Sequence, residues 1–342
     1  MLKKPLKKLL LILLLLPIFG FGQNVNIPDA NFKAYLVGNS TINTNGDNQI
    51  QVSEASAFNG EINCGSMNIS NLTGIEAFTA LTYLVCSDNE LTSLDVSTCS
   101  ALTTLFCGGN PLTSLDVSTC SALTDLSCSD NQLTSLDVST CSALTSLYCS
   151  GDQLTNLNAS GCTALTNLSC HWSQLTNLDV STCSALTSLN CFGNQLTSLD
   201  VSTCSALMFL KCSANQLTSL DVSGCTALTY LDCGGNQLTS LDLRNGNNNN
   251  LAFYGVGNPN LTCINVDDAT WSTANWTVAN YLIDPQHYFS NNCSGTGSIQ
   301  ELNTNKKLLK VTDLLGRETK ATNQVLIHIY DDGTLEKKIV FE

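Results

Sequence analysis

A near-exact repeat of 21 residues constrains the fold of this chain more than any other feature. The coil LTTLFCGGNPLTSLDVSTCSA begins at Leu102, LTDLSCSDNQLTSLDVSTCSA follows at Leu123, and the period continues past Leu228. A single coil cannot bury its own apolar face, whereas stacked coils share one continuous core. Since such a short coil leaves little room for a helix, we expect parallel strands on its inner side and extended or 3₁₀ segments on its outer side.

Within each coil, the segment L-x-x-L-x-C-x-x-N resembles the leucine-rich-repeat signature, with cysteine at the third apolar position. The asparagine place is held by Asn89, Asn110, Asn131, Asn194, Asn215 and Asn236, whereas Asp152 and Ser173 depart from it. The resemblance covers residues 61–245 and is nearest to the short internalin-like repeats of bacteria. It implies a β-rich solenoid, a right-handed superhelix of about ten coils with a cap at each end. In this family the leucines and the third apolar residue point inward, and the asparagine bonds the backbone of the turn.

Sixteen of the 18 cysteines fall on two ladders that follow the repeat. One ladder is Cys64, Cys86, Cys107, Cys128, Cys149, Cys170, Cys191, Cys212 and Cys233, and the other is Cys99, Cys120, Cys141, Cys162, Cys183, Cys204 and Cys225. Equivalent residues on neighbouring parallel coils point the same way, which is an awkward geometry for a disulfide, and cysteine is often buried. We therefore interpret both ladders as reduced core residues. Metal binding and disulfides between the ladders are the alternatives.

Cys263 and Cys293 lie outside the period and bracket a segment with Trp271 and Trp276. The sequence NPNLTCINVDD around Cys263 resembles the closing cap of related exported repeat proteins. This resemblance implies a Cys263–Cys293 disulfide. A C-terminal cap over residues 246–297 is also required physically, because the last coil would otherwise expose apolar core and a strand edge.

Residues 23–60 are predicted to cap the other end of the solenoid. The sequence NIPDANFKAYLVG predicts a short helix with Asp29 as its N-cap. The loop after it resembles an EF-hand or dockerin calcium loop, whose ligands would be Asn43, Asn45, Asp47, Gln49 and Glu54. Asn43 stands where aspartate is usual, and Asn48 replaces the turn glycine. Calcium is the one cofactor that the sequence suggests, and a polar capping turn is the alternative.

An acidic ladder accompanies the recurring segment L-T-S-L-D-V-S. It consists of Asp95, Asp116, Asp137, Asp179, Asp200, Asp221 and Asp242, with Asn158 taking one place. We expect each carboxylate to accept a hydrogen bond from a nearby Ser or Thr backbone N–H group. A row of calcium ions between the coils is the alternative.

Acidic residues dominate the charge of the chain. The formal net charge is −14, and residues 61–243 hold 15 Asp or Glu against one lysine, Lys211. Such a surface repels phosphate backbones and anionic lipids, which excludes nucleic acid as a partner. The chain has 3 histidines and no G-x-S-x-G, H-E-x-x-H or phosphate-binding glycine loop. We therefore expect no enzymatic activity.

Ligand recognition is expected where the coils differ from one another, at the outward positions of the strand segment. The candidate ligand-binding residues of this concave face are Tyr83, Phe106, Asp125, Tyr148, His171, Trp172, Phe192, Phe209, Lys211, Tyr230 and Asp232. Solvent-facing aromatic residues offer a large contact area with little entropy to lose, and they are also favoured in strands by propensity alone. The expected partner is an extracellular protein or glycan. The alternatives are a structural surface component without a discrete ligand and an accessory protein in polysaccharide capture.

The N-terminal residues 1–22 are predicted to be a secretory signal peptide. Four lysines precede an apolar run from Leu9 to Phe19, and a small-x-small site follows at Gly20–Gly22. No later segment approaches membrane-spanning length. We expect an exported mature chain without a transmembrane segment.

The C-terminal residues 298–342 resemble the type A sorting domain of type IX secretion. The matching residues are Val311, Asp313, Leu315, Gly316, Arg317, Tyr330, Asp332, Gly333 and Lys337. Alternating residues on either side of Asp332-Gly333 independently predict a β-hairpin, and thus a small β module. The resemblance implies the type IX secretion machinery as a partner and a secreted or outer cell-surface location.

Overall fold

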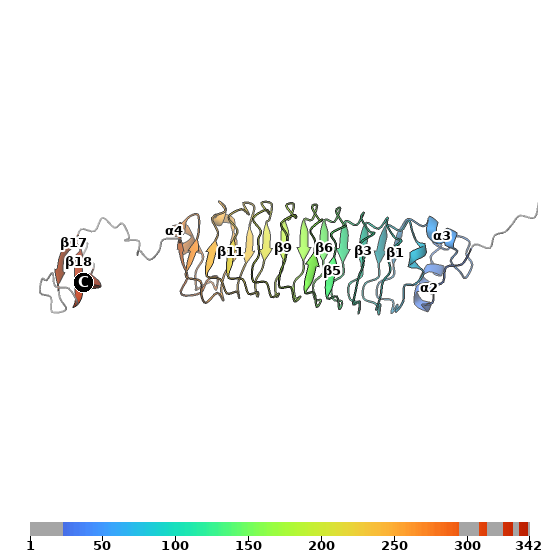
Figure 1. Ribbon diagram of the computed structural model, residues 1–342, viewed down its shortest axis with the longest axis horizontal. Coiled ribbons are helices and arrows are strands. Elements are labelled where there is room, and N and C mark those ends of the chain that lie inside the picture. The colour runs from blue at the N-terminus through green and yellow to red at the C-terminus, as the bar shows by residue number, and fades with distance from the viewer. Residues whose placement is uncertain (1–22, 294–307, 313–323, 331–334, 341–342) are drawn as a thin grey trace, which may run out of the picture. The chain divides into compact units, whose positions relative to one another are not determined.

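The computed structural model describes residues 23–293, 308–312, 324–330 and 335–340. The chain divides after Cys293 into two compact units. The first unit is a parallel β-solenoid of about eleven turns, whose coils stack in one row from α2 (Ala30–Gly38) to α4 (Ala269–Asn275) (Figure 1). The predicted solenoid is confirmed. It has about one coil more than expected, because the chain continues to coil beyond the end of the near-exact repeat.

Ten short strands form one parallel sheet along the stack. In spatial order they are β1 (Glu61–Asn63), β2 (Tyr83–Val85), β3 (Thr104–Phe106), β4 (Asp125–Ser127), β6 (Ser146–Tyr148), β8 (Asn167–Ser169), β9 (Ser188–Asn190), β10 (Phe209–Lys211), β12 (Tyr230–Asp232) and β14 (Ala252–Tyr254). The register places like residues opposite each other, for example Leu105 opposite Leu126. The central residue of each strand is buried, so the residues on either side of it point away from the core.

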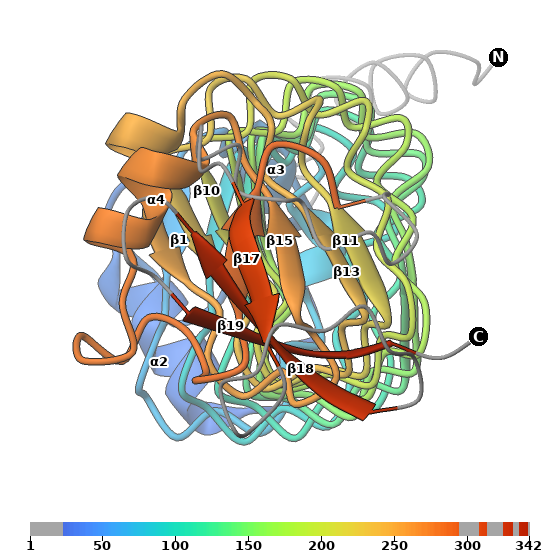
Figure 2. The same ribbon diagram turned by 90° about the vertical axis from the view of Figure 1, so that its left-hand side faces the viewer.

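A second row of strands lies on the opposite side of the coils. These strands are β5 (Ser135–Asp137), paired with β7 (Asn156–Asn158), and a parallel sheet of β11 (Ser219–Asp221), β13 (Ser240–Asp242), β15 (Cys263–Asn265) and β16 (Tyr288–Ser290). Seen along the stack, the coils overlie one another, with β1 and β10 to one side and β11 and β13 to the other (Figure 2). Between α3 (Val52–Ala57) and α4 the chain has two 3₁₀ turns, η1 (Ile75–Ala77) and η2 (Asn248–Asn250), and no α-helix, as the short coil predicts.

Leucine and cysteine side chains fill the space between the two rows of strands. All sixteen ladder cysteines are free and buried. Burial raises the pKa of the Cys99 thiol to about 11 and that of Cys107 well above its ordinary value, so these thiols stay protonated at neutral pH. This arrangement agrees with the interpretation of the ladders as reduced core residues.

Asparagines at the bend after each strand tie neighbouring coils together. Asn110 Nδ2 donates to the carbonyl oxygens of Cys86 and Cys107 at 3.0 and 3.1 Å, and its Oδ1 accepts from a backbone N–H of the preceding coil at 3.0 Å. Each such side chain satisfies buried backbone groups that would otherwise lack partners. Asp152 and Ser173 replace the asparagine in two successive coils, and there Asp152 Oδ2 and Ser173 Oγ are buried without a hydrogen-bond partner.

Two helices, α2 and α3, close the N-terminal end of the solenoid. Asp29 caps α2 as predicted, because its Oδ1 accepts from the backbone N–H groups of Asn31 and Phe32, both at 3.0 Å. Phe32 and Leu36 of α2 are fully buried in the hydrophobic core. This packing covers the apolar side chains of the first coils.

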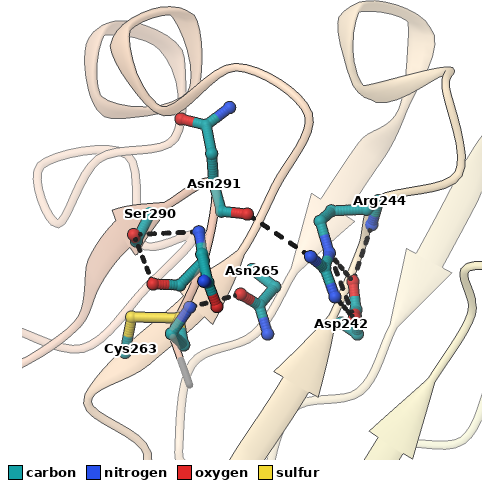
Figure 3. The surroundings of a disulfide bond; sticks show 8 residues. Asp242, Arg244, Cys263, Asn265, Ser290 and Asn291 are labelled. Atoms are coloured by element: carbon teal, nitrogen blue, oxygen red, sulfur yellow. Dashed lines mark hydrogen bonds and ion pairs between the residues drawn. A yellow bond between two sulfur atoms is a disulfide. The ribbon is translucent and has the colours of Figure 1, made fainter. Parts of the chain in front are cut away.

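The C-terminal end is closed by α4 and a disulfide. Trp276 follows α4 and is buried, with its ring 5.0 Å from that of Phe253 and 5.6 Å from that of Phe289. The predicted disulfide between Cys263 and Cys293 is confirmed, with the two Cα atoms 5.8 Å apart (Figure 3).

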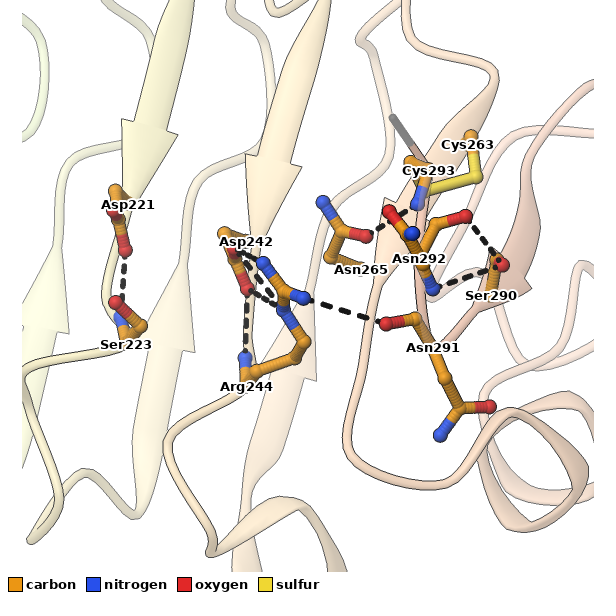
Figure 4. A network of polar contacts seen from close by, with 10 residues as sticks. All are labelled: Asp221, Ser223, Asp242, Arg244, Cys263, Asn265, Ser290, Asn291, Asn292 and Cys293. Atoms are coloured by element: carbon orange, nitrogen blue, oxygen red, sulfur yellow. Dashed lines mark hydrogen bonds and ion pairs between the residues drawn. A yellow bond between two sulfur atoms is a disulfide. The ribbon is translucent and has the colours of Figure 1, made fainter. Parts of the chain in front are cut away.

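Polar contacts surround this disulfide. The Cys293 N–H donates to Asn265 Oδ1 at 2.6 Å. The Arg244 guanidinium pairs with Asp242 on β13 and donates to the Asn291 carbonyl oxygen at 3.4 Å (Figure 4). These contacts fix the last residues of the solenoid unit against β13 and β15.

The second unit is described as an antiparallel sheet of β17 (Leu308–Thr312), β18 (Gln324–Tyr330) and β19 (Leu335–Val340). The strands β18 and β19 form the predicted hairpin, whose Asp332-Gly333 lie outside the described residues. The predicted signal peptide, residues 1–22, also lies outside them. Among the helices that the structure describes, none is both long and apolar enough to cross a membrane.

Candidate functional site

The outward side chains of the ten-stranded sheet and of the bend after each strand form a surface that we call the sheet face. Eight predicted ligand-binding residues lie on its strands, namely Tyr83, Phe106, Asp125, Tyr148, Phe209, Lys211, Tyr230 and Asp232. His171 and Trp172 follow β8, and Phe192 follows β9. The fold therefore brings all eleven to one side of the solenoid. That they bind a ligand stays a prediction.

The N-terminal half of the sheet face holds one aromatic pair. Tyr83 and Phe106 contact edge to face, with their ring centroids 5.9 Å apart. On β4, Asp125 Oδ2 accepts a hydrogen bond from Thr124 Oγ1 at 2.8 Å. On β6, the Tyr148 side chain is exposed. Asp125 and Tyr148 thus lie between this pair and the aromatic residues of the C-terminal half.

The C-terminal half carries five aromatic residues that we call the aromatic strip: Trp172, Phe192, Phe209, Tyr230 and Tyr254. Trp172 contacts Phe192 edge to face, with the centroids 4.8 Å apart. Phe209 and Tyr230 stack at 4.5 Å with an interplanar angle of 11°, and Tyr230 lies 5.6 Å from Tyr254. The Lys211 Nζ lies 4.5 Å from the centroid of the Phe192 ring, a cation–π contact. In-register parallel strands place these rings close enough to form one surface.

His171 lies beside the strip among hydroxyl groups. Its Nδ1 is 2.7 Å from Ser150 Oγ and 2.9 Å from Ser169 Oγ. Partial burial lowers the pKa of His171, and the nearby Lys211 ammonium lowers it further, so the ring is neutral at pH 7. A neutral imidazole held by hydroxyl groups can exchange hydrogen bonds with a partner.

Tyr254 is a member of the strip that was missed in the sequence, because its coil has 22 residues and falls outside the period. It lies on β14 opposite Asp232, and its side chain is 41% exposed. The signal was present: Phe253, Gly255 and Asn258 occupy the leucine, cysteine and asparagine places of the repeat. Asn258 makes the bonds of the asparagine ladder, since its Nδ2 donates to the Gly255 carbonyl oxygen at 2.9 Å.

The backbone at Trp172 is left-handed, with a φ of +53°. The corresponding bend positions of the other coils also have positive φ, and they hold Ser66, Asp88, Gly109, Asp130, Gly151, Gly193, Ala214, Gly235 and Gly257. From Asp88 to Gly235, residues with and without a side chain alternate. A Cβ on Gly193 would lie 3.0 Å from the Trp172 ring, and one on Gly109 or Gly151 would collide with the aspartate before it. Left-handed backbone costs a bulky residue about 1 kcal/mol, and here the indole is 61% exposed.

The loop predicted to bind calcium runs from the turn after α2 into α3, and Glu54, one of its two acidic residues, already has hydrogen-bond partners. Its Oε1 accepts from the backbone N–H groups of Thr44 and Asn45 at 2.8 and 3.1 Å, and its Oε2 accepts from that of Gln51 at 3.0 Å. Partners of this kind are what the polar-turn alternative predicts.

The other loop residues are also drawn into local bonds. Asp47 Oδ1 accepts from the Gln49 N–H at 2.7 Å, and Gln49 Oε1 accepts from Lys33 Nζ at 3.0 Å. Asn43 Oδ1 is buried without a partner. Within the part of the chain that the structure describes, no group of three or more His, Cys, Asp or Glu could hold a metal ion. Calcium binding requires Glu54 to leave these partners, and it stays a prediction.

The acidic ladder is satisfied locally, as predicted. Asp95 and Asp116 each accept the backbone N–H of the serine two residues further on at 2.9 Å, and Asn158 accepts that of Ser160 at 3.2 Å. Hydrogen bonds from the serine side chain and backbone lower the pKa of Asp95 and Asp116. Since an amide makes the same bond at Asn158, a cation between the coils is not needed.

Comparison with solved structures places this chain beside bacterial internalins. The functional domain of InlJ from Listeria monocytogenes, which includes a cysteine ladder, is 30% identical with a TM-score of 0.52, over 71% of this chain and 67% of that chain. Internalin C2 from Listeria monocytogenes strain 4b F2365 is 21% identical with a TM-score of 0.52, over 59% of this chain and 91% of that chain, and shares the fold. No protein-family model and no curated protein matches the chain.

Proposed function

The chain belongs to the internalin-type leucine-rich-repeat family, and on that premise we propose that it is a non-enzymatic binding protein that recognises an extracellular protein or glycan through the sheet face. Its structural neighbours are repeat proteins of binding and adhesion, which supports protein binding. An extracellular location belongs to this proposal, and the disulfide at Cys263–Cys293 supports it, because disulfides are stable outside the cell.

The aromatic strip is the observation that carries this proposal. Equivalent outward positions on other strands hold small polar residues such as Ser146, Ser188 and Ser127, so the fold does not require rings there. Rings also stand in the N-terminal half, at Tyr83, Phe106 and Tyr148, but the C-terminal half holds five on successive coils, as one contacting pair and one contacting group of three. Grouped Tyr and Trp side chains are the usual anchors of protein interfaces.

The test measures binding of the purified full chain to arrays of extracellular proteins and of glycans. We expect the combined substitution Tyr148→Ala, Trp172→Ala and Phe209→Ala to abolish the binding that the wild type shows. A control variant carries Thr113→Ala and Thr197→Ala, two exposed positions on the outer segment of the repeat. If all detected binding survives the triple substitution, the sheet face is not the recognition surface.

We further propose that the chain is exported and carried across the outer membrane by type IX secretion. The lysine-rich and apolar N-terminus, together with the motif residues of 298–342, supports this route. In a bacterium with a type IX system, removal of residues 298–342 is expected to retain the protein inside the outer membrane. Unchanged appearance of the truncated protein outside the cell would contradict the route and leave the binding proposal untouched.

A further inference from the structure

The rings at the centre of the strip have little free surface on their faces. Phe209 and Tyr230 lie parallel at 4.5 Å, so each covers one face of the other, and the Lys211 ammonium covers a face of Phe192. A sugar ring stacks on an aromatic residue by laying its C–H groups against an open face. The strip instead combines rings that cover one another with the exposed Tyr254, and this mixture of polar and apolar groups suits the irregular surface of a protein.

The indole of Trp172 is the exception, since it is the most exposed ring of the strip. Two local rules of the repeat are broken at this one place. A bulky residue occupies a left-handed backbone position, and the next residue, Ser173, replaces the ladder asparagine and leaves its hydroxyl unpartnered. Departures from the local rules that the fold does not need are expected where a chain serves a partner.

The net charge of the solenoid, rather than the immediate surroundings of Trp172, where Lys211 lies on the adjoining Phe192 ring, indicates which partner groups would be attracted. Residues 61–293 hold 18 Asp or Glu and two basic residues, Lys211 and Arg244. Both basic side chains are engaged within the chain, Lys211 with the Phe192 ring and Arg244 with Asp242. The net negative surface therefore favours cationic partners and repels anionic ones. An exposed indole is also the best aromatic acceptor of a guanidinium or ammonium group.

We infer that the partner of the sheet face is a protein with a basic surface, which places an arginine or lysine side chain on the Trp172 indole while neighbouring apolar residues pack on Tyr230 and Tyr254. This inference rests on the proposed function and names the partner class for it. Asp232, held by a hydrogen bond from Ser213 Oγ at 2.7 Å, supplies a fixed carboxylate beside the strip. The indole binds the cationic group, the acidic surface attracts the basic partner, and the two tyrosines supply apolar contact area.

The probes are a random dodecapeptide library displayed on phage and a glycan array, each applied to the full chain. We expect selected peptides to be enriched in Arg or Lys beside an aromatic or aliphatic residue, and to bind more weakly as salt rises. Trp172→Leu keeps apolar area but removes the ring, and is expected to weaken these peptides about tenfold. Trp172→Gly should do the same while folding at least as well, because glycine accepts the left-handed backbone. Tyr288→Leu is the matched control, an exposed aromatic residue on the other sheet.

The outcomes separate the two proposals. Peptides that lack basic residues, or that are weakened by Tyr254→Ala and not by Trp172→Leu, overturn the cationic anchor and leave the sheet face as the binding surface. Binding confined to the glycan array, and lost in Trp172→Leu, overturns the protein partner in the same way. If no ligand from either screen depends on any residue of the strip, the proposed function itself fails.

Discussion

Asp152 stands in the place of one of the asparagines that tie neighbouring coils together, and replacing it with asparagine is expected to stabilise the protein. The Asp152 side chain is 5% exposed; its Oδ1 accepts from the backbone N–H groups of Asn131 and Leu133, whereas its Oδ2 has no partner. In the coils that keep the asparagine, the equivalent atom is an amide nitrogen that donates to two cysteine carbonyl oxygens. An ionised carboxylate puts an acceptor oxygen in the place of that donor, and an acceptor cannot bond to the cysteine carbonyl oxygens.

The magnitude follows from the pKa of this carboxyl. Burial raises it from its ordinary value of 3.8 to about 6, against the opposing effect of the two N–H donors. The folded state thus holds the proton more tightly than the unfolded state, so stability falls as the pH rises from about 4 to above 6. A shift of this size corresponds to about 3 kcal/mol.

Asp152→Asn removes this loss and restores two hydrogen bonds, each of about 1 kcal/mol. The gain is therefore expected to be largest at pH 7 to 8 and to shrink to about 1–2 kcal/mol near pH 4, where the wild-type carboxyl is protonated. Melting temperatures measured between pH 4 and 8 provide the test, with hydrogen exchange at the Asn131 and Leu133 amides as a local readout. The matched control is Asn194→Asp, which creates the same defect in a coil that keeps the asparagine and should lower the melting temperature at pH 7. Equal melting curves for wild type and Asp152→Asn across this pH range would refute the reasoning.

Three further predictions address the core, the bends and the N-terminal loop. Ellman's reagent should find no reactive thiol in the native protein and sixteen after denaturation, since every ladder cysteine is buried; rapid labelling of the native state would show that the ladders are open. Gly193→Ala should destabilise the protein by about 1–2 kcal/mol in thermal unfolding, because it combines a φ of +69° with contact to the Trp172 ring, whereas Gly38→Ala, in open space, should not. Calcium binding requires that a chelator lower the melting temperature of the wild type and leave Glu54→Ala unchanged; a wild type indifferent to the chelator would leave this loop a polar turn.

The solenoid could be predicted from the sequence because its information is local and repeated. Each L-x-x-L-x-C-x-x-N segment indicates which side chains are buried, and the coils can then stack in one register only. The second row of strands could not be predicted in the same way. Ser114-Leu115-Asp116 and Ser135-Leu136-Asp137 are identical, yet only the latter is a strand, so the local sequence does not decide which of these segments pair.

The candidate site was predictable in its location and less so in its extent. Outward positions follow from strand alternation, which is why the fold gathers the predicted residues on one face. Tyr254 was missed because its coil has one residue more than the period and because Gly255 stands in the cysteine place, where the Phe253 ring fills the room of a ladder cysteine. Ring contacts such as Phe209 on Tyr230 depend on side-chain rotamers, and a repeat pattern does not specify those.

From Asp88 to Gly235, the alternation of glycine with side-chain-bearing residues at the bends constrains how this part of the array can change in length. Loss of the coil that holds Gly151 would bring the Asp130 and Trp172 bends next to each other, and gain of a coil would interrupt the order equally. Removal or insertion of two coils, by contrast, keeps each glycine next to a residue with a side chain. The structural unit is one coil of 21 residues, whereas the bend pattern of this part repeats every two coils. Recombination among these coils should therefore favour relatives that differ by an even number of coils.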